Sequence, residues 1–331
     1  MPPSVRTAST GDLPRMADLL THDAATRQAR NPQLWKMACD ARDRVLADLA
    51  RTLTDPAPPF RQCWLVADHD GRLAGVAHSI LLPVPPIYAG AFGPPGLLMP
   101  DCHVSSDAPA GTRQALLDAA EADLRAAGAR LLLASAYTGS AWRATFARNG
   151  YAPLTLYYAR TGLAPGKRAD TVRPASERDL TRIVALSARN RRVLSALDPF
   201  WEPHPQADQR FGDWMARSLT LTDRKMLVSA RAGTVQGYAI AQPASHLHFP
   251  AAHDIEAVGF IDDYFHTDDD DDAAPRDDAA ASGLLKAAEA WLAGRGMTSV
   301  LIVCPAAWRW KRALLEATGH HVAASWYLKR T

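Results

Sequence analysis

The chain has 331 residues, of which 47% are hydrophobic and 22% are charged, and its formal net charge is +2 at pH 7. This composition is typical of a folded protein, and the length favours two domains over one. The near-neutral charge excludes a global electrostatic attraction to nucleic acid or to a membrane surface, so neither is expected as a partner.

The four cysteines, Cys39, Cys63, Cys102 and Cys304, are scattered and form no CxxC pair. Together with an N-terminus that lacks an apolar signal-peptide core, they predict reduced thiols in a cytoplasmic protein. The uncharged run 81–100 contains six prolines and three glycines, which a membrane-spanning helix would not tolerate. We expect a strand end followed by a long turn that can line a cleft.

The stretch 104–133 organises the rest of the chain. Small residues at 104–111 precede a segment in which Leu116, Leu117, Ala120 and Leu124 share one helical face, and Gly128 stands where a helix ends. An apolar strand follows at 130–133. The other expected elements of this half are a strand and helix at 5–20, a helix-rich stretch at 22–54, strands at 62–67 and 73–80, a helix at 140–148 and a strand at 154–160.

The same pattern occurs a second time. Residues 5–20 and 172–187 share eight identical positions at an offset of 167, and Glu121 matches Glu289 at an offset of 168. Tyr158 matches Tyr327 at an offset of 169. A repeat this long indicates duplication of a whole domain rather than a solenoid. The sequence therefore predicts an N-terminal domain at 1–162, a linker at 163–170 and a C-terminal domain at 171–331.

The order strand, helix, hairpin, long strand, small-residue loop, helix, strand, helix, strand resembles the GNAT (Gcn5-related) N-acetyltransferase family. The resemblance covers nearly the whole chain as a tandem repeat. It implies a mixed α/β (α+β) fold, with a mostly antiparallel mixed sheet flanked by helices in each domain. It also implies acetyl-CoA as cosubstrate, with a loop of type Q/R-x-x-G-x-G/A that binds pyrophosphate through amides at a helix start.

Both copies of that loop depart from the family pattern, and they leave open which half binds acetyl-CoA. The second half keeps the leading arginine and the spacing, but it follows five consecutive aspartates at 268–272, which should repel an anion. Electrostatics therefore favours the first half, whereas motif spacing favours the second. The loop residues expected at the cosubstrate are Val104, Ala108, Gly111, Thr112 and Arg113 in the first half, and Arg276, Ala279, Ala280 and Ala281 in the second.

The resemblance also implies a general base on the fourth strand and a tyrosine that protonates the leaving thiolate. Phe146 and Leu315 occupy the tyrosine position, and neither can donate a proton. The candidate bases are Asp101 and His103 in the first half and Asp262 and Asp263, with Glu256 nearby, in the second. The segment 197–204 is a candidate wall of the acceptor site.

Three function classes remain open at this point. The first is an N-acyltransferase that uses acetyl-CoA and a small-molecule amine, as a monomer with an internal pseudo-dimer or as a homodimer. The second is a tandem pseudoenzyme that binds coenzyme A or another ligand as a sensor or scaffold. The third is a structural dimerisation module. His246, His248, His253 and His266 match no compact ligand spacing, so no metal site is expected.

Overall fold

The computed structural model describes residues 3–166, 169–267 and 279–330. The first half contains β1 (Ser4–Thr7), α1 (Leu13–Arg30), α2 (Ala41–Thr54), β2 (Gln62–His69), β3 (Arg72–Leu81), β4 (Gly96–Leu98), β5 (His103–Val104), α3 (Thr112–Ala126), β6 (Leu131–Tyr137), α4 (Trp142–Arg148) and β7 (Ala152–Thr161). The second half contains β8 (Val172–Pro174), α5 (Leu180–Leu197), α6 (Ala207–Ser218), β9 (Lys225–Arg231), β10 (Thr234–Pro243), β11 (Val258–His266), α7 (Ala279–Ala293), β12 (Ser299–Pro305), α8 (Arg309–Ala317) and β13 (His321–Arg330). The predicted fold class is confirmed.

The repeat is visible in the local structure at the start of each half. Arg6 forms two hydrogen bonds of 2.8 Å with the Asp12 carboxylate, and Arg173 pairs with Asp179 in the same way at 2.7 and 2.8 Å. The arginine in each pair holds the pKa of the aspartate well below its usual range. The same residues thus build the same cap before α1 and before α5.

A glycine in each half lets the helix after the small-residue loop pack closely on the sheet. A Cβ at Gly96 in β4 would lie 2.9 Å from Leu124 of α3, and one at Gly259 in β11 would lie 2.7 Å from Leu292 of α7. These distances are below ordinary van der Waals contact, so any side chain here would push the helix away. Both leucines are fully buried, as the helical periodicity predicted.

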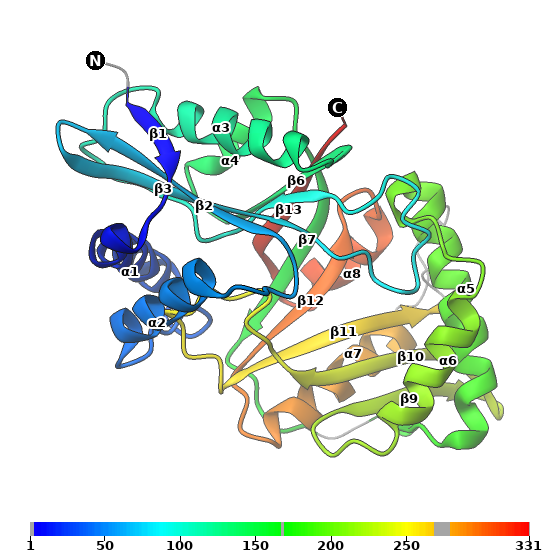
Figure 1. The fold of residues 1–331 in the computed structure, drawn as a ribbon. Helices are drawn as coiled ribbons and strands as arrows, with labels where there is room; N and C mark the ends of the chain where they lie inside the picture. Colours follow the sequence, from blue (N-terminus) through cyan, green and yellow to red (C-terminus); the bar gives the residue numbers. More distant parts are fainter. Residues whose placement is uncertain (1–2, 167–168, 268–278, 331) are drawn as a thin grey trace.

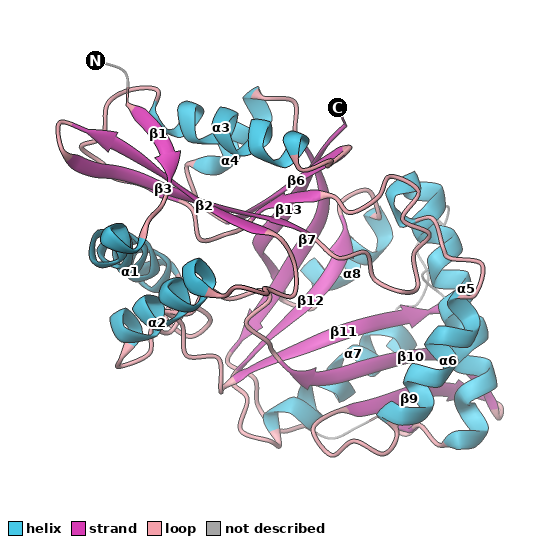
Figure 2. Ribbon diagram, viewed as in Figure 1, coloured by secondary structure: helices cyan, strands magenta, loops and turns pink. Residues whose placement is uncertain are grey.

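The strands of both halves form one 13-stranded sheet, in the order β1-β2-β3-β4-β6-β13-β7-β12-β11-β10-β9-β8, with β5 paired to β3. β4 pairs with β6, and β11 with β12, in parallel, and the other pairs are antiparallel. In Figure 1, α1 and α2 lie on the opposite face of the first half's sheet from α3. In the second half, α5 and α6 lie on the opposite face from α7, and Figure 2 shows the strands as one layer between these helices.

The last strand of each half lies beside the other half's sheet. β13 is hydrogen-bonded between β6 and β7, and β7 is hydrogen-bonded between β13 and β12. Figure 1 shows the red end of the chain running alongside the green strands of the first half. The boundary at 162–171 stays a prediction, but the two halves are joined by exchanged strands as well as by the connecting segment.

Candidate functional site

The second half contains a gap between two parallel strands. β11 and β12 pair from Val258↔Ser299 to Ile261↔Ile302, although both strands continue beyond this point. The register of β11 against β10 also shifts here, so that Asp262 is an extra residue between Ile261 and Asp263. Such a bulge increases the local twist of the strand. β11 therefore departs from β12 at Asp262, and its polar edge faces the space between them.

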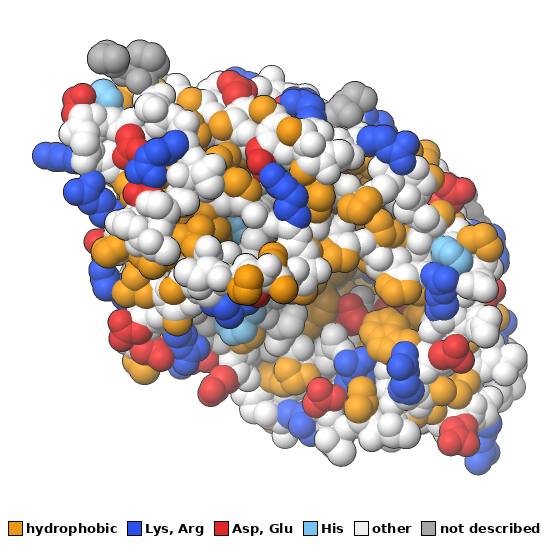
Figure 3. Space-filling model, viewed as in Figure 1, with side chains coloured by type: hydrophobic (Ala, Val, Ile, Leu, Met, Phe, Trp, Pro, Cys, Tyr) orange, Lys and Arg blue, Asp and Glu red, His pale blue; other side chains and the backbone are white. Residues whose placement is uncertain are grey.

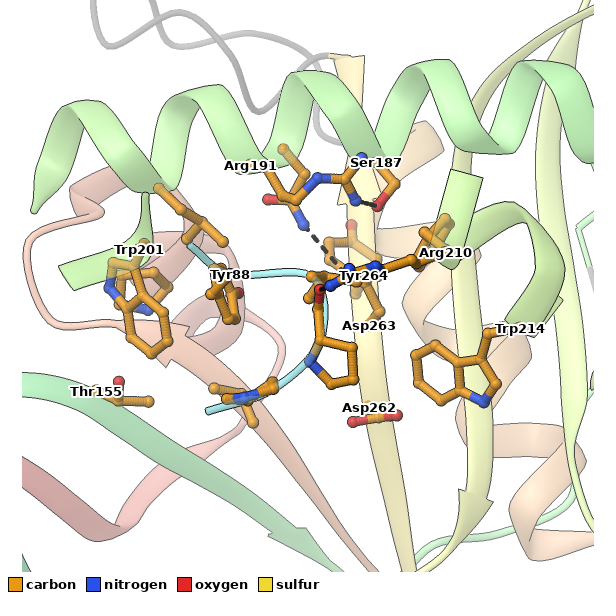
Figure 4. A pocket seen from close by; sticks show the side chains of 18 of the residues that line it. Tyr88, Thr155, Ser187, Arg191, Trp201, Arg210, Trp214, Asp262, Asp263 and Tyr264 are labelled. Atoms are coloured by element: carbon orange, nitrogen blue, oxygen red, sulfur yellow. Dashed lines mark hydrogen bonds between the residues drawn. The ribbon is translucent and has the colours of Figure 1, made fainter. Parts of the chain in front are cut away.

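A cavity of about 660 Å³ opens onto this gap. It is bordered by α5, α6, the ends of β11 and β12, the start of α8 and a loop from the first half. Figure 3 shows a hollow on this face of the molecule, bordered by hydrophobic side chains, and Figure 4 shows the lining residues from close by. The volume falls within the range typical of small-molecule sites.

The loop between β3 and β4 of the first half forms one wall of this cavity. The Ala89 N–H donates to the Glu202 carbonyl at 2.7 Å, the His204 N–H donates to the Ile87 carbonyl at 2.9 Å, and Arg210 donates to the Pro86 carbonyl at 2.7 Å. These bonds anchor the loop to the second half and place Tyr88 against the cavity. The prediction that 81–100 is a strand end and turn lining a cleft is confirmed.

Two neighbouring carboxylates on β11 line the cavity but have different surroundings. The Tyr238 hydroxyl donates to Asp263 at 2.6 Å and the Asn190 amide donates to it at 3.0 Å. Burial raises the pKa of Asp263, and the Tyr238 hydrogen bond opposes that rise. Burial, reinforced by the Asp263 charge, raises the pKa of Asp262 to about 6. A carboxyl group with that pKa is well suited to accept a proton near neutral pH.

Aromatic side chains line the cavity on both sides of the two carboxylates. Figure 4 shows Trp201 and Tyr88 on one side of the strand that carries Asp262 and Asp263, and Trp214 on the other. The rings of Tyr88 and Trp201 are 5.4 Å apart. Trp201 lies in the segment 197–204 that the sequence suggested as an acceptor wall.

Equivalent positions in the two halves place a different side chain across the gap. In the second half, the Lys311 ammonium donates to the Tyr264 carbonyl at 3.1 Å, and Lys311 also lines the cavity. In the first half, the Trp142 indole N–H donates to the Cys102 carbonyl at 3.0 Å. Trp142 is 5% exposed and packs in the hydrophobic core with Phe146. A neutral indole therefore donates across the gap of the first half, and an ammonium donates across that of the second, both from side chains that are 5% exposed.

The first-half candidates Asp101 and His103 are separated by their partners. The Asp101 carboxylate lies 3.0 Å from Nδ1 of His78, whereas Nδ1 of His103 lies 3.3 Å from the Asp23 carboxylate. Asp101 lines a second cavity of about 670 Å³, bordered by α2 and by residues 246–251 of the second half. This cavity is the counterpart of the one on β11, since each is covered by a loop from the other half.

The first-half loop residues lie around the start of α3. Val104 pairs with Gly75 of β3, and the Ala108 N–H donates to the Ser105 carbonyl at 3.2 Å. Gly111 precedes the helix with φ of 90°, which a side chain would strain. The hydroxyl of Thr112 donates to the Pro109 carbonyl at 2.8 Å.

Positive charge gathers at that helix start. Arg113 stacks 5.8 Å from the Trp142 ring centre. Burial, together with the nearby Arg148 charge, lowers the pKa of Arg113. The positive charge that would favour an anion in the first half is therefore present at the start of α3. It lies against Trp142, whose ring donates a hydrogen bond across the gap between the strands.

In the second half, Arg276 and the aspartates 268–272 and 277–278 lie outside the described residues. Ala279, Ala280 and Ala281 form the first turn of α7, and the Ala281 carbonyl accepts a hydrogen bond from the Tyr264 hydroxyl at 2.9 Å. The tyrosine on β11 thus links the strand at the gap to the start of the helix.

Sequence reasoning missed Lys311 and the side chains of α5 and α6 that line the cavity. Lys311 precedes Leu315 by one helical turn, so the signal available was a lysine on a buried helical face. Tyr88 lies in the run 81–100 that was expected to line a cleft, but no local pattern could show that the cleft belongs to the other half. Glu256 is exposed on the turn before β11 and lies outside the lining of the cavity.

Across residues 3–166, 169–267 and 279–330, no group of three or more His, Cys, Asp or Glu side chains is placed to hold a metal ion. No helix in these same ranges combines the length and apolar character needed to cross a membrane.

Comparison with solved structures identifies the fold. The chain is similar to a GCN5-related N-acetyltransferase from Sphaerobacter thermophilus, with a TM-score of 0.58 and 15% identity over 99% of this chain and 95% of that one. The chain has the tandem GNAT fold. It is also similar to a tandem GNAT protein from the clavulanic acid biosynthesis pathway, with a TM-score of 0.51 and 13% identity over 99% and 98% of the two chains. No protein-family model and no curated protein matches the chain. At these identities the comparisons show the fold alone.

Proposed function

We propose that the second half of this tandem GNAT protein transfers an acetyl group from acetyl-CoA to a small-molecule amine. The observation that carries the proposal is the opening between β11 and β12, which leads directly into a cavity of about 660 Å³ containing Asp262. Donor and acceptor would meet at the point where the two strands part.

The residues at the gap fit the acyl donor. Beyond Ile261 and Ile302, the two strands no longer pair with each other. Their main-chain polar groups can therefore bind the extended, amide-containing arm of the acyl donor, as a neighbouring strand would. α7 begins at Ala279, and the unburied side chains of Ala279 and Ala280 are small enough for a phosphate to approach a helix start closely, whereas Ala281 is fully buried. Acetyl-CoA combines such an extended chain with a pyrophosphate.

The cavity chemistry fits a protonated amine with an apolar body. The carboxylates of Asp262 and Asp263 attract an ammonium group, and Tyr88, Trp201 and Trp214 offer apolar and cation–π contacts. Arg191, Arg210 and Arg217 also line the cavity, so this attraction is local to the two carboxylates. A volume of about 660 Å³ suits a small molecule rather than a folded protein surface.

Asp262 is the base in this proposal, and burial together with the neighbouring Asp263 charge raises its pKa. The bound ammonium first loses one proton to solvent. The neutral amine nitrogen then attacks the thioester carbon, its next proton passes to the Asp262 carboxylate, and the C–S bond breaks to leave coenzyme A as the thiolate. A pKa of about 6 keeps Asp262 ionised at pH 7.5 while leaving it basic enough to accept the proton. Asp263 is engaged by Tyr238 and Asn190, so its charge stays beside Asp262.

The first half has a supporting role in this proposal. Its gap is occupied by Trp142, and it contributes Tyr88 to the acceptor wall of the second half. The binding-only alternative therefore applies best to the first half, whose own cavity of about 670 Å³ can hold a ligand without an acyl donor beside it.

Two measurements on the full chain test the proposal. Millimolar acetyl-CoA should raise the thermal unfolding temperature, because a ligand that binds the folded state stabilises it. A panel of small amines should then produce coenzyme A thiol in the presence of the protein, above the rate with acetyl-CoA alone. No stabilisation by acetyl-CoA would contradict any version that uses this donor, and stabilisation without thiol release would favour the binding-only alternative.

A further inference from the structure

Lys311 is a buried lysine at the place where the proposed reaction leaves a negative charge. Its side chain is 5% exposed, and its ammonium lies 5.4 Å from the Trp308 ring centre and 5.5 Å from that of Tyr264. The hydrogen bond to the Tyr264 carbonyl holds it beside the edge of β11, where the strands have parted. A buried ammonium is costly unless charge or hydrogen bonding compensates for it, and here the Tyr264 carbonyl, the two rings and the charge of Asp263 do so.

The position of Lys311 on α8 relates it to the missing acid. The resemblance to the GNAT family places the group that meets the leaving sulfur at Leu315, which has no polar atom. Lys311 lies one turn earlier on the same helix, so its side chain projects from the same face. In the first half the equivalent position is Trp142, which is neutral and buried in the core. At this helix position the positive charge is therefore found in the second half and not in the first.

We propose that Lys311 is the cation that receives the departing coenzyme A thiolate. This proposal rests on the function proposed above. When the amine attacks and the C–S bond breaks, the electron pair leaves on sulfur, and the Lys311 ammonium donates a hydrogen bond to that sulfur and stabilises its charge. The proton lost by the amine goes to Asp262, and the thiolate takes a proton from water as it is released. An ammonium aimed at a charge that develops only in the reaction accelerates the chemical step more than substrate binding.

The sharpest test uses coenzyme A itself and needs no knowledge of the acceptor. Coenzyme A bound to the wild-type protein is titrated with base, and the ultraviolet absorbance of the thiolate reports ionisation of the bound thiol. A cation close to the sulfur should lower the pKa of that thiol by about one unit or more. Lys311→Met should abolish the shift, whereas Lys311→Arg should retain part of it, because the positive charge remains. The exposed Lys286→Met is the control and should match the wild type.

Steady-state rates provide a second readout once an acceptor is found. Lys311→Met should lower kcat by about 100-fold with little change in the KM for acetyl-CoA, and Lys311→Arg should recover part of that loss. Circular dichroism and thermal unfolding of each variant exclude loss of fold as the cause.

The outcomes separate this proposal from the function it rests on. If the wild-type protein does not bind coenzyme A, the proposed function fails. If coenzyme A binds and its thiol has the same pKa in the wild type and in Lys311→Met, the role of Lys311 is refuted while the proposed function stands. An unchanged or increased kcat in Lys311→Met would likewise refute it.

Discussion

Arg160, on the last strand of the first half, donates a hydrogen bond of 2.6 Å to Glu289 on α7 of the second half. The repeat places the reciprocal pair at Lys329 and Glu121, with contacts of 2.8 Å. Both glutamates are buried, at 5% exposure, so each exchanged strand supplies the cation for a buried carboxylate of the other half. The exchange of β7 and β13 is therefore tied to charge pairing as well as to the backbone ladder.

Removing Arg160 takes one of two partners from the buried Glu289 carboxylate and leaves it beside His320, whose Nε2 lies 3.0 Å away. Arg160→Met is expected to lower the free energy of unfolding by about 1–3 kcal/mol, measured by chemical denaturation. The exposed pair of Arg42 and Asp18 is the matched control, and Arg42→Met should cost less than about 1 kcal/mol. Equal losses in the two variants would contradict a special role for the exchanged-strand pair.

The exchanged strands also predict that neither half folds independently. Without β13, the polypeptide 1–162 leaves β6 and β7 each without the neighbour that the intact sheet gives them. An isolated first half should be insoluble or aggregate, whereas co-expression with 163–331 should give a soluble complex. A monomeric, cooperatively unfolding 1–162 fragment would contradict the strand order.

The raised pKa of Asp262 should make both stability and activity depend on pH. Folding raises this pKa from 3.8 to about 6, so the folded state binds more protons between these values and loses stability as pH rises through that window. Asp262→Asn should therefore be more stable than the wild type at pH 7.5, by at most about 3 kcal/mol, with the difference vanishing near pH 4. The exposed Asp43→Asn should show no such trend.

The Asp262 carboxylate should also determine how kcat/KM falls at acidic pH. For the wild type, kcat/KM should rise with pH to a plateau, with a midpoint near 6. A pH profile that is flat between 5 and 7 under conditions where the protein stays folded would exclude Asp262 as the base.

The acceptor wall should be sensitive to a residue of the other half. Tyr88→Ala removes a ring that lines the cavity and packs 5.4 Å from Trp201, so the KM for the amine should rise about 10-fold or more while the KM for acetyl-CoA stays near its wild-type value. Trp201→Ala should act in the same direction. The exposed Leu221→Ala provides a control distant from the cavity lining. Unchanged amine kinetics in Tyr88→Ala would remove the first half from the acceptor site.

The fold was readable from sequence because its signals are local and occur twice. The helical face of Leu116 and Leu124, the stop at Gly128 and the matched caps at Asp12 and Asp179 each depend on neighbouring residues. The strand exchange was not readable, since β7 and β13 have the same pattern in either arrangement. Glu121 and Glu289 showed the repeat without showing that their cations come from the opposite half.

The site was only partly predictable for a related reason. Asp262 and Asp263 were identified because carboxylates on the fourth strand suggest a base, and both line the cavity. Lys311 and Trp142 occupy equivalent positions, but their contrasting roles depend on which strand gap stays open, which is a property of tertiary packing. Motif spacing favoured the second half and electrostatics favoured the first half as the acetyl-CoA site. Neither argument could decide between them, because neither takes account of the side chain that crosses the gap.

The most direct test of the central claim compares thiol release from acetyl-CoA by the wild type, Asp262→Asn and Asp101→Asn with the same amine panel. Each substitution removes a carboxylate from the cavity of one half. The account predicts that Asp101→Asn keeps most of the wild-type rate and that Asp262→Asn loses about 100-fold or more. Retained activity in Asp262→Asn together with loss in Asp101→Asn would contradict it and would move the reaction to the first half.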